Sequence, residues 1–268
     1  MQAIESNEEI LKTLEASARE SAAVGREVVP VGPFLAVIDP RTDSPWVNVA
    51  IPAGPLGSAT SVAAALDRLR GVFADRRRTL RFEFSAALWP TLPAALERAG
   101  LVEDARQTVM TAAAGDVPAV EPGEGVRLRR MPADAADALL SEYEAAKGRG
   151  FNDDLEPFPP ADMRNEMADR RRLCAYAEID GAIAGTGELT PAGSVAELVG
   201  VAVVPEARRR GIGAALCSEL CRDWFDGGGT LVWLSAQNAV ARQLYQRIGF
   251  RDADVLLHYI DAAAVAKP

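Results

Sequence analysis

The stretch ELVGVAVVPEARRRGIGAAL, residues 197–216, changes character at Pro205. Before the proline, a Val-rich apolar run is typical of a buried strand, and after Gly213 apolar residues recur at the spacing of a helix. Gly211 and Gly213 have no Cβ, so the chain can turn tightly and a ligand can approach the main chain. N–H groups at a helix start attract anions, and the basic side chains beside them are Arg208, Arg209 and Arg210. The stretch therefore predicts a strand, a turn and a helix that hold a pyrophosphate.

Other phosphate-binding loops fit this stretch less well. A P-loop needs Lys followed by Ser or Thr after its last glycine, where this chain has Ala214 and Ala215. The dinucleotide-binding fingerprint needs a third glycine, and Leu216 occupies that place. What remains is R-x-x-G-x-G after a Val-rich strand and V-x-P, which resembles motif A of the GCN5-related N-acetyltransferases (GNAT), a family that binds acetyl-CoA at this loop. The alternative is a basic, glycine-rich turn without a ligand.

A second motif lies downstream in QNAVARQLYQRIGF, residues 237–250. Asn238 is placed to cap a helix with its side-chain oxygen, and Gly249 is placed to end it. The pattern N-x-x-A-x-x-L-Y-x-x-x-G-F is similar to motif B of the same family, in which the tyrosine hydroxyl lies near the sulfur of coenzyme A. The resemblance implies this position for Tyr245. The alternative is a surface helix whose Tyr245 only packs against the core.

The resemblance also implies which residues contact the cofactor, acetyl-CoA, and that no metal takes part. Main-chain N–H groups at a strand irregularity near Val201 and Val203 would polarise the thioester carbonyl and hold the pantetheine arm. The implied cofactor-binding residues are Val201, Ala202, Val203, Arg208, Arg209, Arg210, Gly211, Ile212, Gly213, Ala214, Asn238, Ala241 and Tyr245.

Acetyl transfer to an amine also requires a base, because an amine of pKa about 10 is mostly protonated at neutral pH. Glu197 stands eleven residues before Arg208, at the place of the catalytic glutamate in histone-acetylating members of the family. The resemblance implies that Glu197 is the base and Tyr245 the acid for the leaving thiolate. Glu188 on the preceding strand is the second candidate, and a water relay or a solvated Glu197 without a role stays open.

Composition places the chain among globular proteins with ample core. Its 268 residues are 49% hydrophobic and 25% charged, with a net charge of -9. An acidic chain is not expected to bind nucleic acid, and the basic runs 76–78 and 170–172 are predicted to be solvated. No apolar window is long enough to span a membrane, and MQAIESNEEI carries acids where a signal peptide carries bases, so we expect a cytoplasmic location.

Three cysteines, Cys174, Cys217 and Cys221, are too few for a disulfide framework. Cys217 and Cys221 are four residues apart on one predicted helix, which leaves a metal pair or a reactive thiol as an alternative. His258 is the one histidine that could complete a metal site. We therefore expect all three cysteines in the core.

The order of predicted elements occurs twice. The first half is predicted to contain a strand, a helix, a second strand and a second helix that ends at Gly100. Their sequences, in this order, are VNVAIP, SVAAALDRLRGVF, TLRFEFSA and LPAALERAGL. The second half repeats this order through the two motifs, ending at Gly249. We predict an α/β fold of two tandem GNAT-like domains, each a mixed, mostly antiparallel sheet flanked by helices. The predicted limits are 1–116 for the first domain, 117–124 for the linker and 125–268 for the catalytic domain.

The first copy lacks the chemistry of the second. PAGPLGSAT stands where the second copy has PEARRRGIG, so it has no arginine, and Pro55 removes a backbone donor. Leu96 takes the place of the tyrosine. We interpret the first domain, which begins with a helix over residues 8–21, as a degenerate copy that supports or covers the second or forms a homodimer; binding of another acyl carrier stays open.

The sequence thus predicts an acetyl-CoA-dependent N-acetyltransferase for a primary amine of a small molecule or peptide, with no membrane or nucleic-acid partner. The resemblance implies that the acidic loop 151–160, which contains Asp153, Asp154 and Glu156, lies at the acceptor mouth, where these acids would meet a cationic amine. The alternative is that they are ordinary solvated loop residues. The alternative from another class is a non-catalytic acyl-CoA sensor or partner-binding protein.

Overall fold

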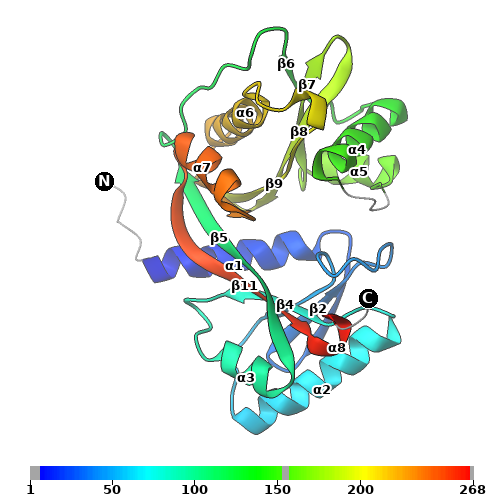
Figure 1. The fold of residues 1–268 in the computed structure, drawn as a ribbon, viewed down its shortest axis with the longest axis vertical. Helices are drawn as coiled ribbons and strands as arrows, with labels where there is room; N and C mark the ends of the chain where they lie inside the picture. Colours follow the sequence, from blue (N-terminus) through cyan, green and yellow to red (C-terminus); the bar gives the residue numbers. More distant parts are fainter. Residues whose placement is uncertain (1–6, 153–156, 266–268) are drawn as a thin grey trace. The chain divides into compact units, whose positions relative to one another are not determined.

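The computed structural model describes residues 7–152 and 157–265. The chain folds into two compact units: unit 1 comprises Met1–Val109 and Ala253–Pro268, and unit 2 comprises Met110–Asp252. Strand β5 (Leu101–Ala113) passes from unit 1 into unit 2, and strand β11 (Arg251–Asp261) passes back (Figure 1). Each unit has a hydrophobic core of its own.

Unit 1 contains a mixed sheet with the strand order β1-β2-β3-β4-β11. Its neighbours are antiparallel except for β3 and β4, which are parallel and joined by helix α2. Apolar residues of α2 at helical spacing, such as Val62, Leu66 and Leu69, are buried in the core. Besides β5 and β11, the elements are α1 (Asn7–Ala23), β1 (Glu27–Val31), β2 (Phe34–Ile38), β3 (Val49–Pro52), α2 (Ala59–Asp75), β4 (Arg81–Ser85), α3 (Leu92–Arg98) and α8 (Ala262–Val265).

Unit 2 contains a mixed sheet with the strand order β10-β9-β8-β7-β6. Its neighbours are antiparallel except for β9 and β10, which are parallel and joined by a 3-10 turn and helix α6. The elements are β6 (Arg127–Arg130), α4 (Asp137–Phe151), α5 (Pro160–Ala168), β7 (Leu173–Ile179), β8 (Ala182–Ala192), β9 (Val195–Val203), the 3-10 turn η1 (Pro205–Ala207), α6 (Ile212–Asp226), β10 (Leu231–Ala236) and α7 (Ala239–Arg247).

Helices cover both faces of the unit 2 sheet, and glycines allow the close approach. A Cβ on Gly185 of β8 would lie 2.6 Å from Ile212 of α6. On the other face, a Cβ on Gly150 of α4 would lie 2.7 Å from the Cβ of Ala202 on β9. Only glycine fits these two contacts. The predicted fold class, a mixed and mostly antiparallel sheet flanked by helices, is confirmed.

Local sequence signals correspond to local structure. Asp180 and Gly181 both have positive φ, 50° and 83°, in the tight turn between β7 and β8, as a two-residue hairpin of this composition requires. The Asn238 side chain accepts a hydrogen bond of 3.0 Å from the Ala241 N–H at the start of α7. Gly249 ends α7 with a φ of 98°. The predicted hairpin, cap and helix end are confirmed.

The predicted repeat of elements is visible in both units. In unit 1 the order is β3, α2, parallel β4, α3 and Gly100; in unit 2 it is β9, α6, parallel β10, α7 and Gly249. Gly100 and Gly249 both have positive φ, 84° and 98°. The tandem interpretation, with limits at 116 and 125, remains a prediction, and the compact units divide the chain differently because β11 pairs with β4 in unit 1.

The segment predicted as the linker packs on α6. The Val120 N–H donates to Ser218 Oγ at 3.2 Å, and that hydroxyl donates to the Pro118 carbonyl at 2.6 Å. The Gly123 N–H donates to the carbonyl of Arg210 at 3.1 Å. These contacts connect residues 117–124 directly to the helix that follows the predicted phosphate loop. Among the residues described, no helix has the length and apolar character needed to cross a membrane.

Candidate functional site

The parallel strands β9 and β10 separate within unit 2. Val195 pairs with Leu231 and Ala196 with Val232, and the last pair is Glu197 with Trp233. Residues 198–203 continue β9 beyond this point, and in the described part of the chain they have no partner on β10. The backbone on this side of β9 is therefore available to an extended ligand.

A bulge interrupts β9 just after the separation. Its register with β8 shifts between Thr186 and Glu188, where one more residue is present on β9 than on β8. Gly200 lies at the bulge with a φ of 63°, and its carbonyl accepts a hydrogen bond of 2.9 Å from Thr186 Oγ1. This is the predicted strand irregularity next to Val201. A bulge turns the adjacent backbone groups away from the regular ladder.

The loop before α6 presents main-chain donors. Arg209 and Gly211 have positive φ, 64° and 73°, and α6 has no side-chain cap. The first helical hydrogen bond runs from the Ala215 N–H to the Gly211 carbonyl at 3.0 Å. Within the described residues, no protein group accepts from the N–H groups of residues 209–214. This arrangement is suited to an anion.

The three loop arginines are exposed and form no ion pair within the described residues. Arg208 donates to the Val203 carbonyl at 3.2 Å and to the Gly150 carbonyl at 2.9 Å, which joins the end of β9 to α4. Arg210 donates to the Glu124 carbonyl at 2.7 Å. The positive charge of the loop is therefore not neutralised by these contacts.

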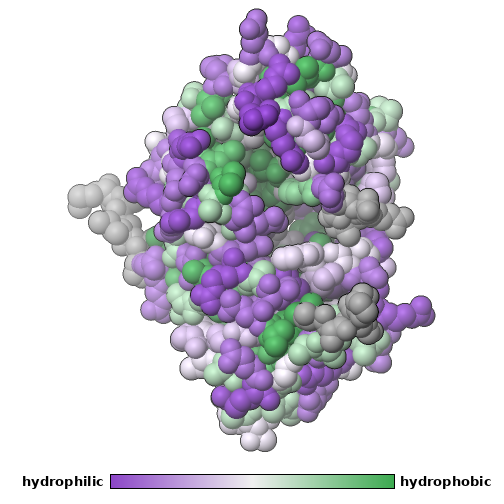
Figure 2. Space-filling view, viewed as in Figure 1, coloured by the Kyte–Doolittle hydropathy of each residue, from purple (hydrophilic) through white to green (hydrophobic). Residues whose placement is uncertain are grey.

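Helix α6, helix α7 and β9 meet at Gly213. A Cβ on this buried residue would lie 3.7 Å from Leu244, 3.8 Å from Val203 and 4.0 Å from Val201. Ile212 is buried and Ala214 half-buried at the same helix start. Ala202 faces the other way and packs on Gly150 of α4, so its main chain alone can take part on the α6 side. In Figure 2, apolar surface forms the floor of a hollow in the region of α7 and β9.

Tyr245 lies on α7 and packs against the unit 2 core. Its ring centroid is 5.9 Å from that of Phe250, and Ala241 and Leu244 pack against the same core. Burial raises the pKa of the Tyr245 hydroxyl well above its ordinary value of 10. The hydroxyl is therefore a proton donor over the physiological range.

Glu197 is half-buried at the last paired position of β9. Its cross-strand partner on β8 is Thr190, and Glu188 lies two residues along that strand. Because directly opposed residues share a face and alternate residues of a strand do so as well, Glu197 lies on the same face of the sheet as Glu188. The structure thus places Glu197 where β9 and β10 separate, on the face covered by α4.

The surroundings of the second candidate base, Glu188, argue against that role. Its carboxylate is buried between Lys147 Nζ at 2.9 Å and Arg172 Nη1 at 2.6 Å. Despite burial, these two cations lower the pKa of Glu188 to about 2. A carboxylate with this pKa has almost no tendency to take a proton from an amine.

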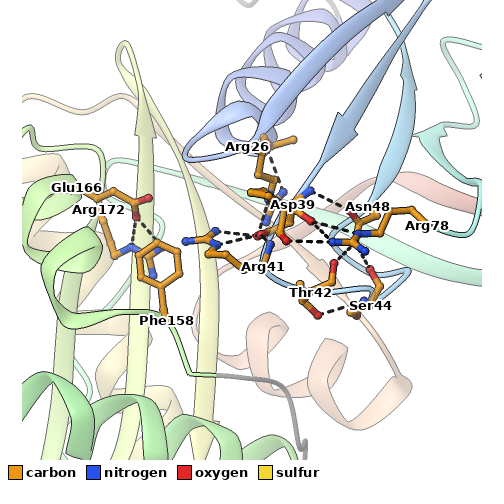
Figure 3. Close-up of polar contacts among 12 residues, drawn as sticks. Arg26, Asp39, Arg41, Thr42, Ser44, Asn48, Arg78, Phe158, Glu166 and Arg172 are labelled. Atoms are coloured by element: carbon orange, nitrogen blue, oxygen red, sulfur yellow. Dashed lines mark hydrogen bonds and ion pairs between the residues drawn. The ribbon is translucent and has the colours of Figure 1, made fainter. Parts of the chain in front are cut away.

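Glu188 belongs to a buried charge network on the α4 face of the sheet. Lys147 also binds Glu144 at 2.5 Å, and Arg172 binds Glu166 at 2.7 Å and lies 4.5 Å from the ring centroid of Phe158 (Figure 3). Three carboxylates thus face two cations. The prediction that the whole run 170–172 is solvated is wrong, because the Arg172 side chain is only 16% exposed.

Sequence reasoning missed this network. Its one local signal is Glu188 within the apolar strand AIAGTGEL, because a buried acid needs a partner. The partners come from α4 and from the segment before β7, and no sequence spacing identifies them. Phe158 at the end of the predicted acceptor loop donates its N–H to Glu144 at 3.2 Å. Asp153, Asp154 and Glu156 lie outside the described residues.

The three cysteines are buried, as predicted, in the unit 2 core. Burial raises the pKa of the Cys221 thiol to about 12. A thiol with this pKa is not a nucleophile at neutral pH, so the structure favours packing over reactivity.

Comparison with known proteins agrees with this geometry. Residues 136–250 match the profile of the Acetyltransferase (GNAT) family. A GCN5-related N-acetyltransferase from Kribbella flavida has a similar structure, with a TM-score of 0.78 and 25% identity over 94% of this chain and 96% of that one. A second from Sphaerobacter thermophilus has a TM-score of 0.66 and 17% identity over 94% of this chain and 90% of that one.

A tandem GNAT protein from the clavulanic acid biosynthesis pathway shares the fold, with a TM-score of 0.60 and 16% identity over 85% of this chain and 77% of that one. A search of curated protein sequences gave no significant match.

Proposed function

We propose, from the premise that this chain is a member of the GCN5-related N-acetyltransferase superfamily, that it transfers an acetyl group from acetyl-CoA to a primary amine of a small molecule or peptide. Unit 2 carries this activity. Family membership supports acetyl transfer in general, and the finer statement rests on the geometry of unit 2.

One observation carries the proposal: within the described residues, the N–H groups of residues 209–214 before α6 have no protein acceptor, and the arginines beside them have no carboxylate partner. Such a loop fits a pyrophosphate, because helix-start amides and guanidinium groups both favour phosphate oxygens. The free side of β9 at residues 198–203 fits an amide-containing arm, which can hydrogen-bond as an added strand. When bound, acetyl-CoA supplies the activated acetyl group.

The residues of unit 2 then divide the work of transfer. The bulge at Gly200 directs main-chain N–H groups near Val201 and Val203 toward the acetyl carbonyl and stabilises negative charge there. Glu197 accepts the proton of the acceptor amine, directly or through water. Tyr245 donates its hydroxyl proton to the departing sulfur. Its raised pKa keeps the hydroxyl protonated at neutral pH and also makes it a weaker acid.

Unit 1 supports the proposal by contrast. The Ser58 side chain accepts from the Ser61 N–H at 3.2 Å, so α2 caps itself. The equivalent start of α6 has no side-chain cap. No arginine lies in the loop 52–60. We therefore infer that unit 1 is a degenerate copy without a coenzyme A site.

Release of free thiol from acetyl-CoA against a panel of amines tests the activity, and calorimetry tests the site. The double variant R208A/R210A is expected to weaken acetyl-CoA binding by about 10-fold or more, because charge-assisted contacts to phosphate are lost. The control R171A removes an exposed arginine of the same unit that pairs with Asp169 and should bind normally. Equal affinity of both variants would contradict the pyrophosphate site. Tight binding without turnover on any amine would favour the alternative, a non-catalytic acyl-CoA sensor.

A further inference from the structure

One face of the unit 1 sheet carries buried polar groups that acetyl transfer does not use. Along β4, Phe82 and Phe84 lie in the apolar core of unit 1. Arg81 and Glu83 alternate with them and therefore occupy the opposite face. His258 on β11 lies directly opposite Glu83 and shares this face.

The guanidinium of Arg81 is buried and only partly paired. The side chain has no exposed surface, and its Nε donates to Asp104 at 2.9 Å. The ring of Trp46 lies over the guanidinium, 3.8 Å from ring centroid to Cζ. Both terminal nitrogens, Nη1 and Nη2, are buried and have no hydrogen-bond partner among residues 7–152 and 157–265. Buried cationic donors without acceptors are strongly unfavourable, so each one requires an explanation.

His258 lies beside this group and is unpaired as well. It is 1% exposed, and in the described part of the chain neither ring nitrogen has a hydrogen-bond partner. Its ring centroid is 5.8 Å from that of Trp46, and the nearest carboxylate oxygen, on Glu83, is 3.6 Å from Nδ1. Burial and the charge of Arg81 lower the pKa of His258 to about 3. The neutral ring has one N–H to donate and one nitrogen that accepts.

The fold does not require a charge at this strand position. In the repeated pattern, T-L-R at residues 79–81 corresponds to T-L-V at residues 230–232. Val232 is fully buried on β10. An apolar residue therefore fits this place in a strand of the same order, and replacing a buried charge with an apolar residue is often neutral or stabilising. The arginine at this position therefore calls for an explanation other than the fold.

The aromatic platform is held in place by its loop. The Asn48 side chain accepts from the Asp39 N–H at 2.8 Å and donates to the carbonyls of Ser44 at 2.8 Å and Thr42 at 3.0 Å (Figure 3). Trp46 lies within this loop. Asp104 thus holds Nε of Arg81, and Trp46 packs on the face of the guanidinium. Nη1 and Nη2 form the remaining edge, which has no hydrogen-bond partner among the described residues.

We propose that this edge of Arg81, with His258 beside it, is a binding site for a small carboxylate in unit 1. The two terminal nitrogens match the two oxygens of a carboxylate in one plane. The planar fork of Arg81, whose Nε already pairs with Asp104, matches the two oxygens of one carboxylate. Burial raises the pKa of the neighbouring Glu83, and the charges of Arg81 and Arg26 oppose this rise.

Thermal unfolding of the full chain in sodium acetate or formate, at ionic strength held constant with sodium chloride, tests the site. Wild type should show a saturable rise in Tm of about 2–4 °C as acetate exceeds its Kd about tenfold. R81M should lose this rise. The matched control R106M removes an exposed arginine of the same unit that pairs with Glu103, and it should keep the rise.

R81M is expected to fold, because it removes a buried charge with two unpaired donors. R81K is a second variant that keeps the charge and loses the planar fork, and it should also lose the response to acetate. A crystal structure grown with formate should show the anion on the Nη1–Nη2 edge. The proposal is overturned if wild type and the Arg81 variants respond equally, or if the crystal shows only water or a protein group at both nitrogens.

Discussion

Tyr245 shows at the scale of one residue how packing keeps a hydroxyl in its protonated form. Burial against the unit 2 core raises the pKa of its hydroxyl, so the proton remains bound up to alkaline pH. Y245F should therefore lower kcat by about 10-fold or more while acetyl-CoA affinity changes little, because the ring packing survives and only the donor is lost. Stopped-flow thiol release and calorimetry separate the two quantities. An unchanged kcat would exclude Tyr245 as the acid.

Glu197 permits a complementary test at the same scale. E197Q removes the proposed base and should lower the alkaline-rising limb of the kcat/KM profile, because the amine then loses its proton to solvent alone. The measurement is kcat/KM from pH 6 to pH 10, because the acceptor amine loses its proton as the pH approaches its pKa of about 10. If E197Q and wild type have identical pH profiles, Glu197 is not the base, and catalysis then depends on positioning of the substrates and on solvent.

Thr186 fixes the bulge through a single hydroxyl. The residue has no exposed surface, and its Oγ1 donates to the Gly200 carbonyl. T186V keeps the shape and removes the donor, and should destabilise the fold by about 1–3 kcal/mol and lower kcat more than acetyl-CoA affinity. T186S keeps the hydroxyl and should restore most of the activity. If T186V and T186S have equal kcat, the hydroxyl does not position the bulge.

At the scale of elements, the start of α6 depends on a residue without a side chain. A Cβ on Gly213 would meet its neighbours at 3.7–4.0 Å, an ordinary van der Waals distance. G213A should therefore fold and bind acetyl-CoA nearly normally. G213V adds two methyl groups between α6, α7 and β9, and should lower acetyl-CoA affinity by about 10-fold or more, because crowding pushes these elements apart. Calorimetry measures the acetyl-CoA affinity of both variants. If G213A loses as much affinity as G213V, the loss comes from a change at the start of α6 and not from crowding between the elements.

The charge network joins three elements, α4, α5 and β8, through Glu188. The pKa of Glu188 in the folded protein, about 2, lies below its ordinary value of 4.5. The network therefore stabilises the fold above pH 4.5 and loses this contribution as the pH falls toward 2. Urea unfolding at pH 6 and pH 3 should show a smaller pH dependence for E188Q than for wild type, and an equal dependence would assign the acid sensitivity to other groups.

For the whole molecule, the two units predict one coenzyme A per chain. Of the two corresponding helix starts, the α6 loop of unit 2 combines arginines with N–H groups that have no acceptor among the described residues, whereas Ser58 caps the start of α2 in unit 1. Calorimetry of the full chain should give a stoichiometry of one, and R208A/R210A should weaken that single event. A second site that persists in this variant would contradict the interpretation of unit 1 as a degenerate copy.

Sequence by itself determined the features that depend on near neighbours. The strand, loop and helix around Gly211, the cap at Asn238 and the helix end at Gly249 follow from spacing and from residues that tolerate positive φ. The repeated order of elements and the fold class also follow, because hydrophobic periodicity marks which segments become strands and helices.

Tertiary structure alone decided the features that depend on distant partners. The ion pairs of Glu188 with Lys147 and Arg172 join residues from separate elements, as does the stacking of Trp46 on Arg81. The pairing of β11 with β4 is also a tertiary feature. Its register places His258 opposite Glu83 on the polar face of the sheet. The physical reason is that burial and neighbouring charges change the pKa of a group, or leave its donors unpaired, only after folding has brought distant residues into contact. The spacing of residues along the sequence does not identify these contacts.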